Sequence, residues 1–309
     1  MNAVQIDLKN AETFPSRRTE TWKYSDLKRW LREAPEPSGP VAVSGEGPFA
    51  TLGGEALAFA NGRATGADAF VASGVQTLRL RFVSDAVNTG HTASVRIAAR
   101  AGAKLLLLES HEGAGSAYVA HNRVELDVPA GAEVTRVVLV DEPEDAISVT
   151  NAVVRVEAGG LYRQTIVTTG AKLQRLETQV SHGAEGADVR LDGLYLLKGS
   201  RHADLTSVVD HLAADGTDAR MAHNALIASE RGEIDAKPEL IIYADDVQCA
   251  PGNTVGTLDE SALFYIQQRG IPADEARALL TQAFLIEVVD RIEDEAAREV
   301  VRAWLTARL

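Results

Sequence analysis

The sequence predicts a mainly β protein whose core is a solenoid of stacked β-coils, preceded by a helical segment and followed by a helical region. Three observations predict this fold. Short runs rich in Val, Leu, Ile and Thr recur from about residue 49, and turns that contain Gly separate them. Those turns return at a nearly constant spacing. After residue 257 the apolar residues change to a helical period. We therefore divide the chain into residues 1–48, 49–257 and 258–309.

The repeated turn carries most of the fold prediction. Its glycines, Gly74, Gly102, Gly131 and Gly160, are 28, 29 and 29 residues apart, and Gly186 follows after 26 more. A period of this size is typical of a solenoid, in which each coil buries its inward face only by stacking on its neighbours. Because strand-like runs fill every repeat, the coils should be β-coils. A β-sandwich also spaces short strands regularly and stays the alternative.

The N-terminal segment predicts one helix and a linker. The stretch "SRRTETWKYSDLKRWLREA" (16–34) has a helical spacing of apolar residues, with Ser16 or Thr19 as a candidate N-cap. Four side chains would share one face of this helix: Trp22, Leu27, Trp30 and Leu31. The following stretch, 35–48, is rich in Pro and Gly, which predicts a linker.

The C-terminal region predicts three helices. The first begins at Asp259 as N-cap and ends at Gly270, and Pro272 suits the first turn of the second. The second helix would bury one apolar stripe: Ala276, Leu279, Leu280, Ala283, Phe284 and Val288. The third, 294–308, carries its own apolar set: Val300, Val301, Trp304 and Leu305.

Composition excludes several classes of function. The net charge of −13 opposes binding to nucleic acid, because phosphate contacts need Lys and Arg. No apolar run reaches the roughly 20 residues of a membrane helix. A single cysteine cannot form an internal disulfide, so we expect a cytoplasmic protein. Neither a P-loop nor a G-x-S-x-G motif occurs, and no histidines have a zinc-site spacing, which favours a scaffold over an enzyme.

The only cysteine, Cys249, has three interpretations. It is a nucleophile if a base such as His211 or His223 approaches it, a solitary ligand of a shared cluster, or a buried inert thiol. The preceding Asp245 and Asp246 would point to opposite faces of a strand, so they do not make an acid/base pair.

Two long motifs carry a family resemblance. The stretch "FPSRRTETWKYSDL" (14–27) resembles the N-terminal signature of the SufB/SufD family. The stretch "EIDAKPELIIYADDVQCAPGNTVGTLDESALFYIQQRGI" (233–271) resembles its C-terminal signature, and residues 208–217 and 224–240 fit as well. The resemblance implies a right-handed parallel β-helix flanked by helical regions, in a non-catalytic scaffold subunit of the SufBCD iron–sulfur cluster assembly complex.

The resemblance also implies partners. Such a subunit pairs with SufB through the β-helix and docks the SufC ATPase on its C-terminal helices, and in isolation it can form a homodimer. Family position implies five docking residues: Phe264, Tyr265, Arg269, Gly270 and Phe284. Plain core packing is the alternative for the two phenylalanines. No cofactor is expected on this chain alone, while an iron–sulfur cluster and a reduced flavin would belong to the complex.

The chain departs from the family pattern in three places. Pro251 stands where the family usually has a histidine, so Cys249 would be an interface thiol or a lone shared ligand. The stretch around 211–217 is shorter than in the family by about one coil, and little precedes Phe14. A β-helix enzyme acting on polysaccharide or ester bonds stays the rival, and it would need Asp246 beside another carboxylate and a histidine in a groove.

Overall fold

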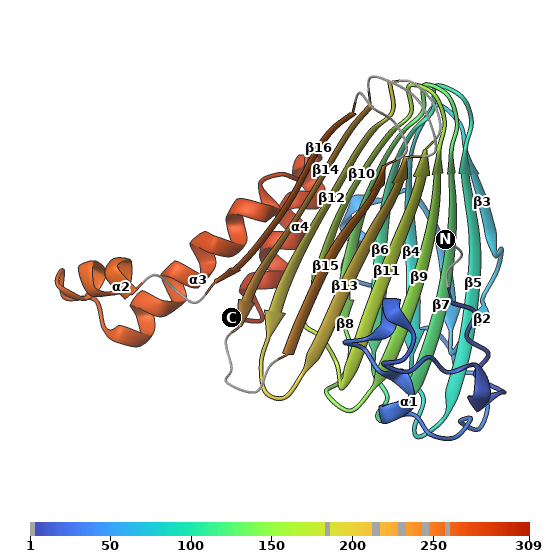
Figure 1. The fold of residues 1–309 in the computed structure, drawn as a ribbon, viewed down its shortest axis with the longest axis horizontal. Coiled ribbons are helices and arrows are strands. Elements are labelled where there is room, and N and C mark those ends of the chain that lie inside the picture. The colour runs from blue at the N-terminus through green and yellow to red at the C-terminus, as the bar shows by residue number, and fades with distance from the viewer. Residues whose placement is uncertain (1–3, 183–185, 212–216, 228–232, 243–246, 257–259) are drawn as a thin grey trace.

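A computed structural model describes residues 4–182, 186–211, 217–227, 233–242, 247–256 and 260–309. In this part of the chain the strands form two sheets that face each other along one long solenoid (Figure 1). The nine-stranded sheet contains β1 (Glu55–Ala60), β2 (Arg63–Ala64), β4 (Val75–Ser84), β6 (Lys104–Gly113), β8 (Glu133–Asp141), β10 (Leu161–Thr168), β12 (Asp188–Leu197), β14 (Thr217–Ile227) and β16 (Val247–Gly256). The seven-stranded sheet contains β3 (Ala69–Ala72), β5 (Gly90–Ala99), β7 (Val119–Val128), β9 (Ile147–Val156), β11 (Leu173–His182), β13 (His202–His211) and β15 (Glu233–Ile242).

Successive strands from β3 to β16 alternate between the two sheets, so each coil contributes one strand to each. Neighbours within a sheet are parallel, apart from the short hairpin of β1 and β2. In the nine-stranded sheet Lys104 pairs with Glu133, which pairs with Leu161, and these steps of 29 and 28 residues are the spacing seen in the sequence. The predicted β-solenoid is therefore confirmed, with about five turns, and the β-sandwich alternative is excluded.

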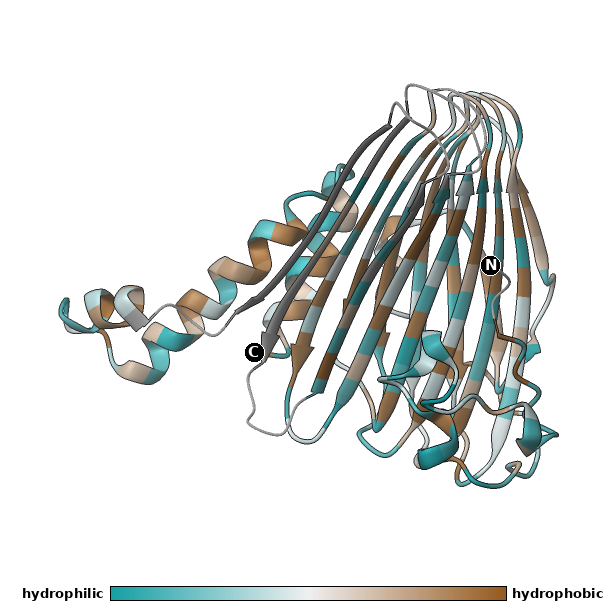
Figure 2. Cartoon of the chain, viewed as in Figure 1, coloured by the Kyte–Doolittle hydropathy of each residue, from teal (hydrophilic) through white to brown (hydrophobic). Residues whose placement is uncertain are grey.

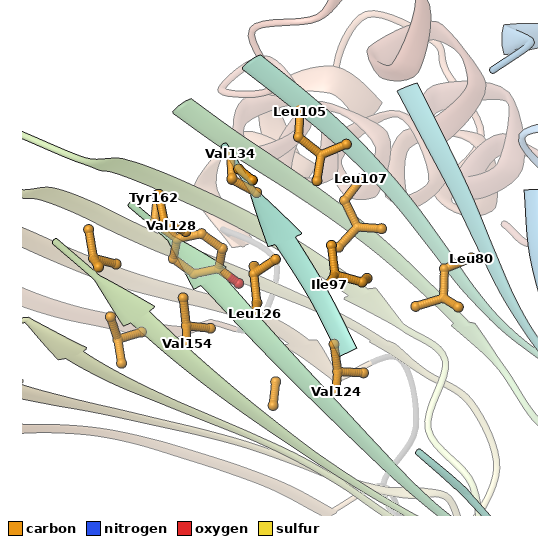
Figure 3. Packing of buried hydrophobic residues seen from close by; sticks show 14 of the residues in the cluster. Leu80, Ile97, Leu105, Leu107, Val124, Leu126, Val128, Val134, Val154 and Tyr162 are labelled. Carbon is orange, nitrogen blue, oxygen red and sulfur yellow. The ribbon is translucent and has the colours of Figure 1, made fainter. Parts of the chain in front are cut away.

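The main core fills the space between the sheets. Because side chains alternate along a strand, every second residue points inward. Hydrophobic and hydrophilic residues accordingly alternate along many of the strands (Figure 2). Leu105, Leu107 and Val134 of one sheet meet Leu126 and Val154 of the other in this interior (Figure 3).

The turn glycines have the backbone geometry that the repeat predicts, with one correction. Gly102, Gly131 and Gly186 have φ of 71°, 67° and 73°, a left-handed conformation that glycine adopts most readily. In the fourth turn this conformation belongs to Gly159, with φ of 63°, and not to Gly160. Gly160 takes the next position, one residue before the strand.

The predicted helix over 16–34 is wrong in extent. Regular structure in this range is limited to one short 3₁₀ turn, Glu20–Trp22, and the four-residue α1 (Leu27–Trp30), and another 3₁₀ turn, Ala11–Thr13, precedes it. Asp26 accepts a hydrogen bond from the backbone of Arg29 as an N-cap and has a non-helical conformation, so the chain turns there. The apolar prediction still holds, because the four side chains join one cluster on the outer face of the seven-stranded sheet.

The Pro- and Gly-rich stretch is attached to the solenoid rather than free. The backbone of Ser38 donates to the carbonyl of Gly90, and the Gly90 backbone donates to Glu36, at 2.8 and 2.7 Å. A further 3₁₀ turn, Ala50–Leu52, leads into β1. This linker therefore lies along the first coils.

Three helices follow the solenoid, as predicted: α2 (Glu260–Gln267), α3 (Ala273–Val289) and α4 (Glu295–Thr306). The proposed cap Asp259 lies outside the described residues. Gly270, with φ of 84°, lies in the turn that ends α2, and Pro272 is the N-cap residue of α3. Asp294 caps α4 through the backbone of Ala297.

The predicted apolar stripe of α3 is only partly correct. Leu279 is 44% exposed, because the first half of α3 projects away from the solenoid together with α2 (Figure 1). The last turns of α3 do pack, and there the buried residues are Leu285, Val288 and Val289. One helix therefore has two environments, which its own periodicity does not reveal.

Candidate functional site

The most exposed aromatic side chains of the C-terminal region lie on α2. Phe264 is 63% exposed and Tyr265 is 58% exposed. Core packing is therefore excluded for Phe264. Large apolar groups held in solvent on a projecting element are typical of a protein contact surface. We call α2, the turn to Pro272 and the first half of α3 the hairpin.

Arg269 orders the exposed face of the hairpin. Its guanidinium lies 4.7 Å from the centre of the Tyr265 ring, and it also donates a hydrogen bond to the Tyr265 hydroxyl. A cation stacked on an aromatic face restricts both side chains. Gly270, directly after it, has no heavy atom within 4 Å of the place where a Cβ would stand. Three of the five predicted docking residues, Tyr265, Arg269 and Gly270, thus lie within six residues of Phe264 and are open to solvent.

Phe284, the fifth predicted docking residue, has a different position. It is partly buried and packs against an apolar cluster between the helices and the outer face of the nine-stranded sheet. In that cluster Val137, Val167 and Leu194 meet Leu285 and Val288. Phe284 therefore lies where α3 meets the nine-stranded sheet, which we call the root of the hairpin, whereas Phe264 lies near its tip.

Cys249 lies on β16, the outermost described strand of the nine-stranded sheet. Its backbone pairs with Ala219 of β14, and Pro251 pairs with Met221. The surroundings of the Cys249 side chain lie outside the described part of the structure, as do Asp245 and Asp246. The register therefore places this thiol position on an edge strand and leaves its chemistry a prediction.

The two sheets end on the same side of the solenoid. Among the described strands β15 is the last of one sheet and β16 the last of the other (Figure 1). The outer edge of a last strand presents backbone N–H and C=O groups that can pair with another chain. This end, which we call the open edge, is the natural place for strand-to-strand association.

A groove lies between the linker and α4. It has a volume of about 480 Å³, and its walls include Val83, Leu139 and Trp304. Its charged lining residues Glu112, Asp141 and Arg308 are already paired, Glu112 with Arg81 behind the groove wall. Arg81 makes two hydrogen bonds to Glu112, at 2.9 and 2.6 Å, and Arg308 donates to Asp141.

A charged network that the sequence analysis did not find crosses the interior of the solenoid. Arg136 makes two hydrogen bonds to Glu109 and a third to Gln164, at 2.9, 2.9 and 2.8 Å. His111 approaches Glu109 at 2.8 Å, and the Gln164 amide donates to Thr178 of the other sheet. Burial alone raises the pKa of Glu109, but Arg136 and His111 outweigh it and hold that pKa below its ordinary value.

The N-terminal motif covers a second ionic cluster, on the outer face of the seven-stranded sheet. The buried Trp22 ring lies 4.4 Å from the guanidinium of Arg175, which pairs with Glu177 at 2.8 Å and with Asp204. Ser25 also donates to Asp204. Trp22 and Ser25 of the motif "ETWKYSDL" therefore attach the N-terminal segment to β11 and β13.

No group of three or more His, Cys, Asp or Glu side chains among the described residues is arranged to hold a metal ion. No described helix is both long and apolar enough to span a membrane.

Comparison with known proteins identifies the family. The model of the SufBD core domain of the SUF system for FeS cluster assembly matches residues 82–217 and 212–284, more than half of the chain. The SufD assembly protein of Escherichia coli is 39% identical over 105 residues, which are 34% of this chain and 24% of that protein. SufD of Bacillus subtilis is 28% identical over 145 residues, 45% of this chain and 33% of that protein.

A SufBD family protein of Synechocystis is 27% identical over 214 residues, 60% of this chain and 47% of that protein. The matched stretches thus span less than half the length of each of these three relatives. The family model covers the solenoid from β4 onward and reaches into α3. The chain belongs to the SufBD family of iron–sulfur cluster assembly proteins, and SufD proteins are among its relatives.

Proposed function

We propose that this chain is a non-catalytic scaffold subunit of a cytoplasmic SufBCD complex that pairs with SufB and docks the SufC ATPase. Family membership supports the assembly role. The observation that carries the docking role is a hairpin that projects from the solenoid with Phe264 and Tyr265 exposed. Exposed aromatic anchors flanked by an ordered arginine are the residue types that dominate protein contacts.

We assign SufC to the hairpin. Phe264, Tyr265, Arg269 and Gly270 would contact it, and Phe284 would support the helix from its buried side. The chain has no P-loop of its own, so ATP binding and hydrolysis would belong to SufC. The ATPase cycle would then move the hairpin against the solenoid.

We assign SufB to the open edge. Two parallel sheets that end together offer backbone pairing across both β15 and β16. Cys249 on β16 would then lie at the subunit interface, as an interface thiol or as one shared ligand of a cluster under assembly. In the absence of SufB, we expect the same edge to pair with a second copy of the chain.

The cluster is cargo in this proposal, and a reduced flavin would bind elsewhere in the complex. The groove beside α4 has the volume for a ring system. Its lining arginine, Arg308, is, however, engaged by Asp141, so it offers a poor contact for the phosphates of a flavin nucleotide. We therefore place no flavin in the described part of this chain.

Co-purification with SufB and SufC tests the proposal. Phe264→Asp should weaken SufC binding by about 30-fold or more, the effect expected for an anchor residue, and should leave SufB binding unchanged. Val75→Asp is the matched control, because Val75 is 83% exposed on the solenoid and lies outside the hairpin. Circular dichroism checks that both variants are folded. Equal SufC affinity for the folded Phe264→Asp variant and the parent would refute docking on the hairpin.

A further inference from the structure

The root of the hairpin combines one apolar contact with one buried ionic contact. The α3 helix has 17 residues, so it is a rod of roughly 25 Å. Its free half carries α2, and its last turns rest on the nine-stranded sheet through Leu285, Val288 and Val289. Apolar packing of this kind is non-directional. It holds the root of the rod to the sheet but does not by itself define the direction in which the rod points.

The directional contact is made by Asp192 of β12. Its side chain is 4% exposed, and Oδ1 accepts a hydrogen bond from Nη1 of Arg291 at 3.0 Å. Its other oxygen accepts from Nε of Arg190, two residues earlier on the same strand, at 2.8 Å. Arg291 lies in the turn that directly follows α3. Charge-assisted hydrogen bonds from a buried carboxylate depend strongly on geometry, unlike the apolar contact beside them.

The other ion pairs at this turn are more exposed. Arg163 of β10 lies 3.2 Å from Glu293, which is 59% exposed, and Arg302 of α4 pairs with Asp290, which is 50% exposed. Exposed pairs of this type contribute little to stability. Glu287 also approaches Arg291, at 3.4 Å, and is 68% exposed. Asp192 is thus the buried member of this set.

We propose that Asp192 is a positioning residue that sets the direction of α3 through Arg291, and thereby the orientation of the protein docked on the hairpin. The identity of the docked protein rests on the proposed docking function, whereas the role of Asp192 in setting the direction of α3 does not. Neutralising Asp192 removes the negative charge that strengthens the hydrogen bond from Arg291 and leaves the apolar contact in place. The hairpin then stays attached and folded, but it samples several directions relative to the sheet.

Spin-label distances test this directly in the full chain. Labels at Gln268→Cys, on the exposed end of the hairpin, and Ser94→Cys, on an exposed position of β5, would be introduced in a Cys249→Ala background. The parent should give one narrow distance distribution. Asp192→Asn should broaden it, with the ratio of anchored to displaced hairpins falling by about tenfold or more, because the buried ion pair loses its negative charge.

Three further variants make the test specific. Arg291→Gln should reproduce the broad distribution from the other side of the contact, and Arg291→Lys, which keeps a charged donor, should restore the narrow one. Glu287→Gln removes a carboxylate from the solvent side of the same guanidinium and should change nothing. If Asp192→Asn does not fold, Arg291→Gln decides the question. Narrow distributions for both variants in folded protein overturn the proposal.

SufC binding is measured separately on the unlabelled parent and the unlabelled Asp192→Asn variant, with Gln268 and Ser94 intact, because Gln268 lies within the hairpin. Affinity should be unchanged within about twofold in Asp192→Asn, because Phe264 and Tyr265 lie far along the rod from the root. Failure of SufC to bind the parent would contradict the proposed function, while the distance distributions would still decide the role of Asp192.

Discussion

Arg136 and Glu109, one coil apart, form a two-hydrogen-bond ion pair whose side chains have no exposed surface. A buried charge without its partner is strongly destabilising, whereas replacing both partners by apolar groups is often tolerated. Arg136→Met should therefore lower the free energy of unfolding by about 3–5 kcal/mol. The double variant with Glu109→Leu should lose less than Arg136→Met alone. Urea denaturation measures both, and additive losses would show that the pair is not coupled.

Trp22 should hold the N-terminal segment on the sheet. The side chain is completely buried and stacks on Arg175, so Trp22→Ala should cost about 3–5 kcal/mol of local stability. Limited proteolysis within 16–34 should become faster, while the solenoid keeps its far-ultraviolet circular dichroism. Trp30→Ala is the control, since Trp30 is only partly buried, and it should have a smaller effect. Unchanged proteolysis in Trp22→Ala would show that other contacts hold the segment.

His91 should make the fold sensitive to mild acid. Burial, and then the charge of Arg63, lower the pKa of His91 from 6.5 to about 4. The unfolded chain takes up this proton below pH 6.5 and the folded chain does not, so stability is complete above pH 6.5 and falls as the pH decreases toward 4. The difference between the pKa of 6.5 in the unfolded chain and about 4 in the folded chain corresponds to a loss of up to about 3 kcal/mol of stability.

Urea denaturation between pH 7.5 and 4.5 measures this effect, with His91→Gln as the reference. The two hydrogen-bond partners of His91 are Ser38 and Ser84. The glutamine variant lacks the titrating ring, but its amide can still form hydrogen bonds with these two hydroxyls. Wild type should lose more stability than the variant over this range. Parallel pH profiles would show that other groups account for the acid sensitivity.

Replacement of glycine by alanine should cost a different amount of stability at each of three positions. Gly159→Ala forces a side chain into a left-handed conformation with open space around it, at a cost of about 1–2 kcal/mol. Gly115→Ala should cost more, because its Cβ would stand 2.0 Å from the carbonyl oxygen of Ala86. Gly66→Ala, with neither a positive φ nor a neighbour within 4 Å, should be neutral. Thermal unfolding ranks the three, and equal midpoints would contradict the ranking.

The predicted helices show where the local sequence pattern is sufficient to locate an element and where it is not. Apolar spacing located α4 to within two residues, because its apolar stripe and the Asp294 cap seen in the structure are both local to the segment. The same reasoning over 16–34 grouped the correct apolar residues but assigned them to one helix. There the sheet supplies the contacts, and Trp22 can be buried from a 3₁₀ turn as well as from an α-helix.

The candidate site was predictable only in part. Phe264 and Tyr265 come from family position, and their exposure agrees with a contact surface. Asp192 and Arg291 are 99 residues apart and belong to no motif that the sequence analysis found. Their contact exists because α3 returns to the outer face of β12, which no local pattern specifies.

The spacing of glycines and strand-like runs by itself determined the coil length and the stacking of strands, because a left-handed turn and an alternating strand are properties of short segments. The same local chemistry located the three C-terminal helices. Tertiary structure alone decided which sheet face each flanking segment covers and which charges are buried together. Glu109 and Arg136 meet because residues 27 apart become neighbours in adjacent coils, and the burial that makes their pairing strong arises only when both sheets close around them.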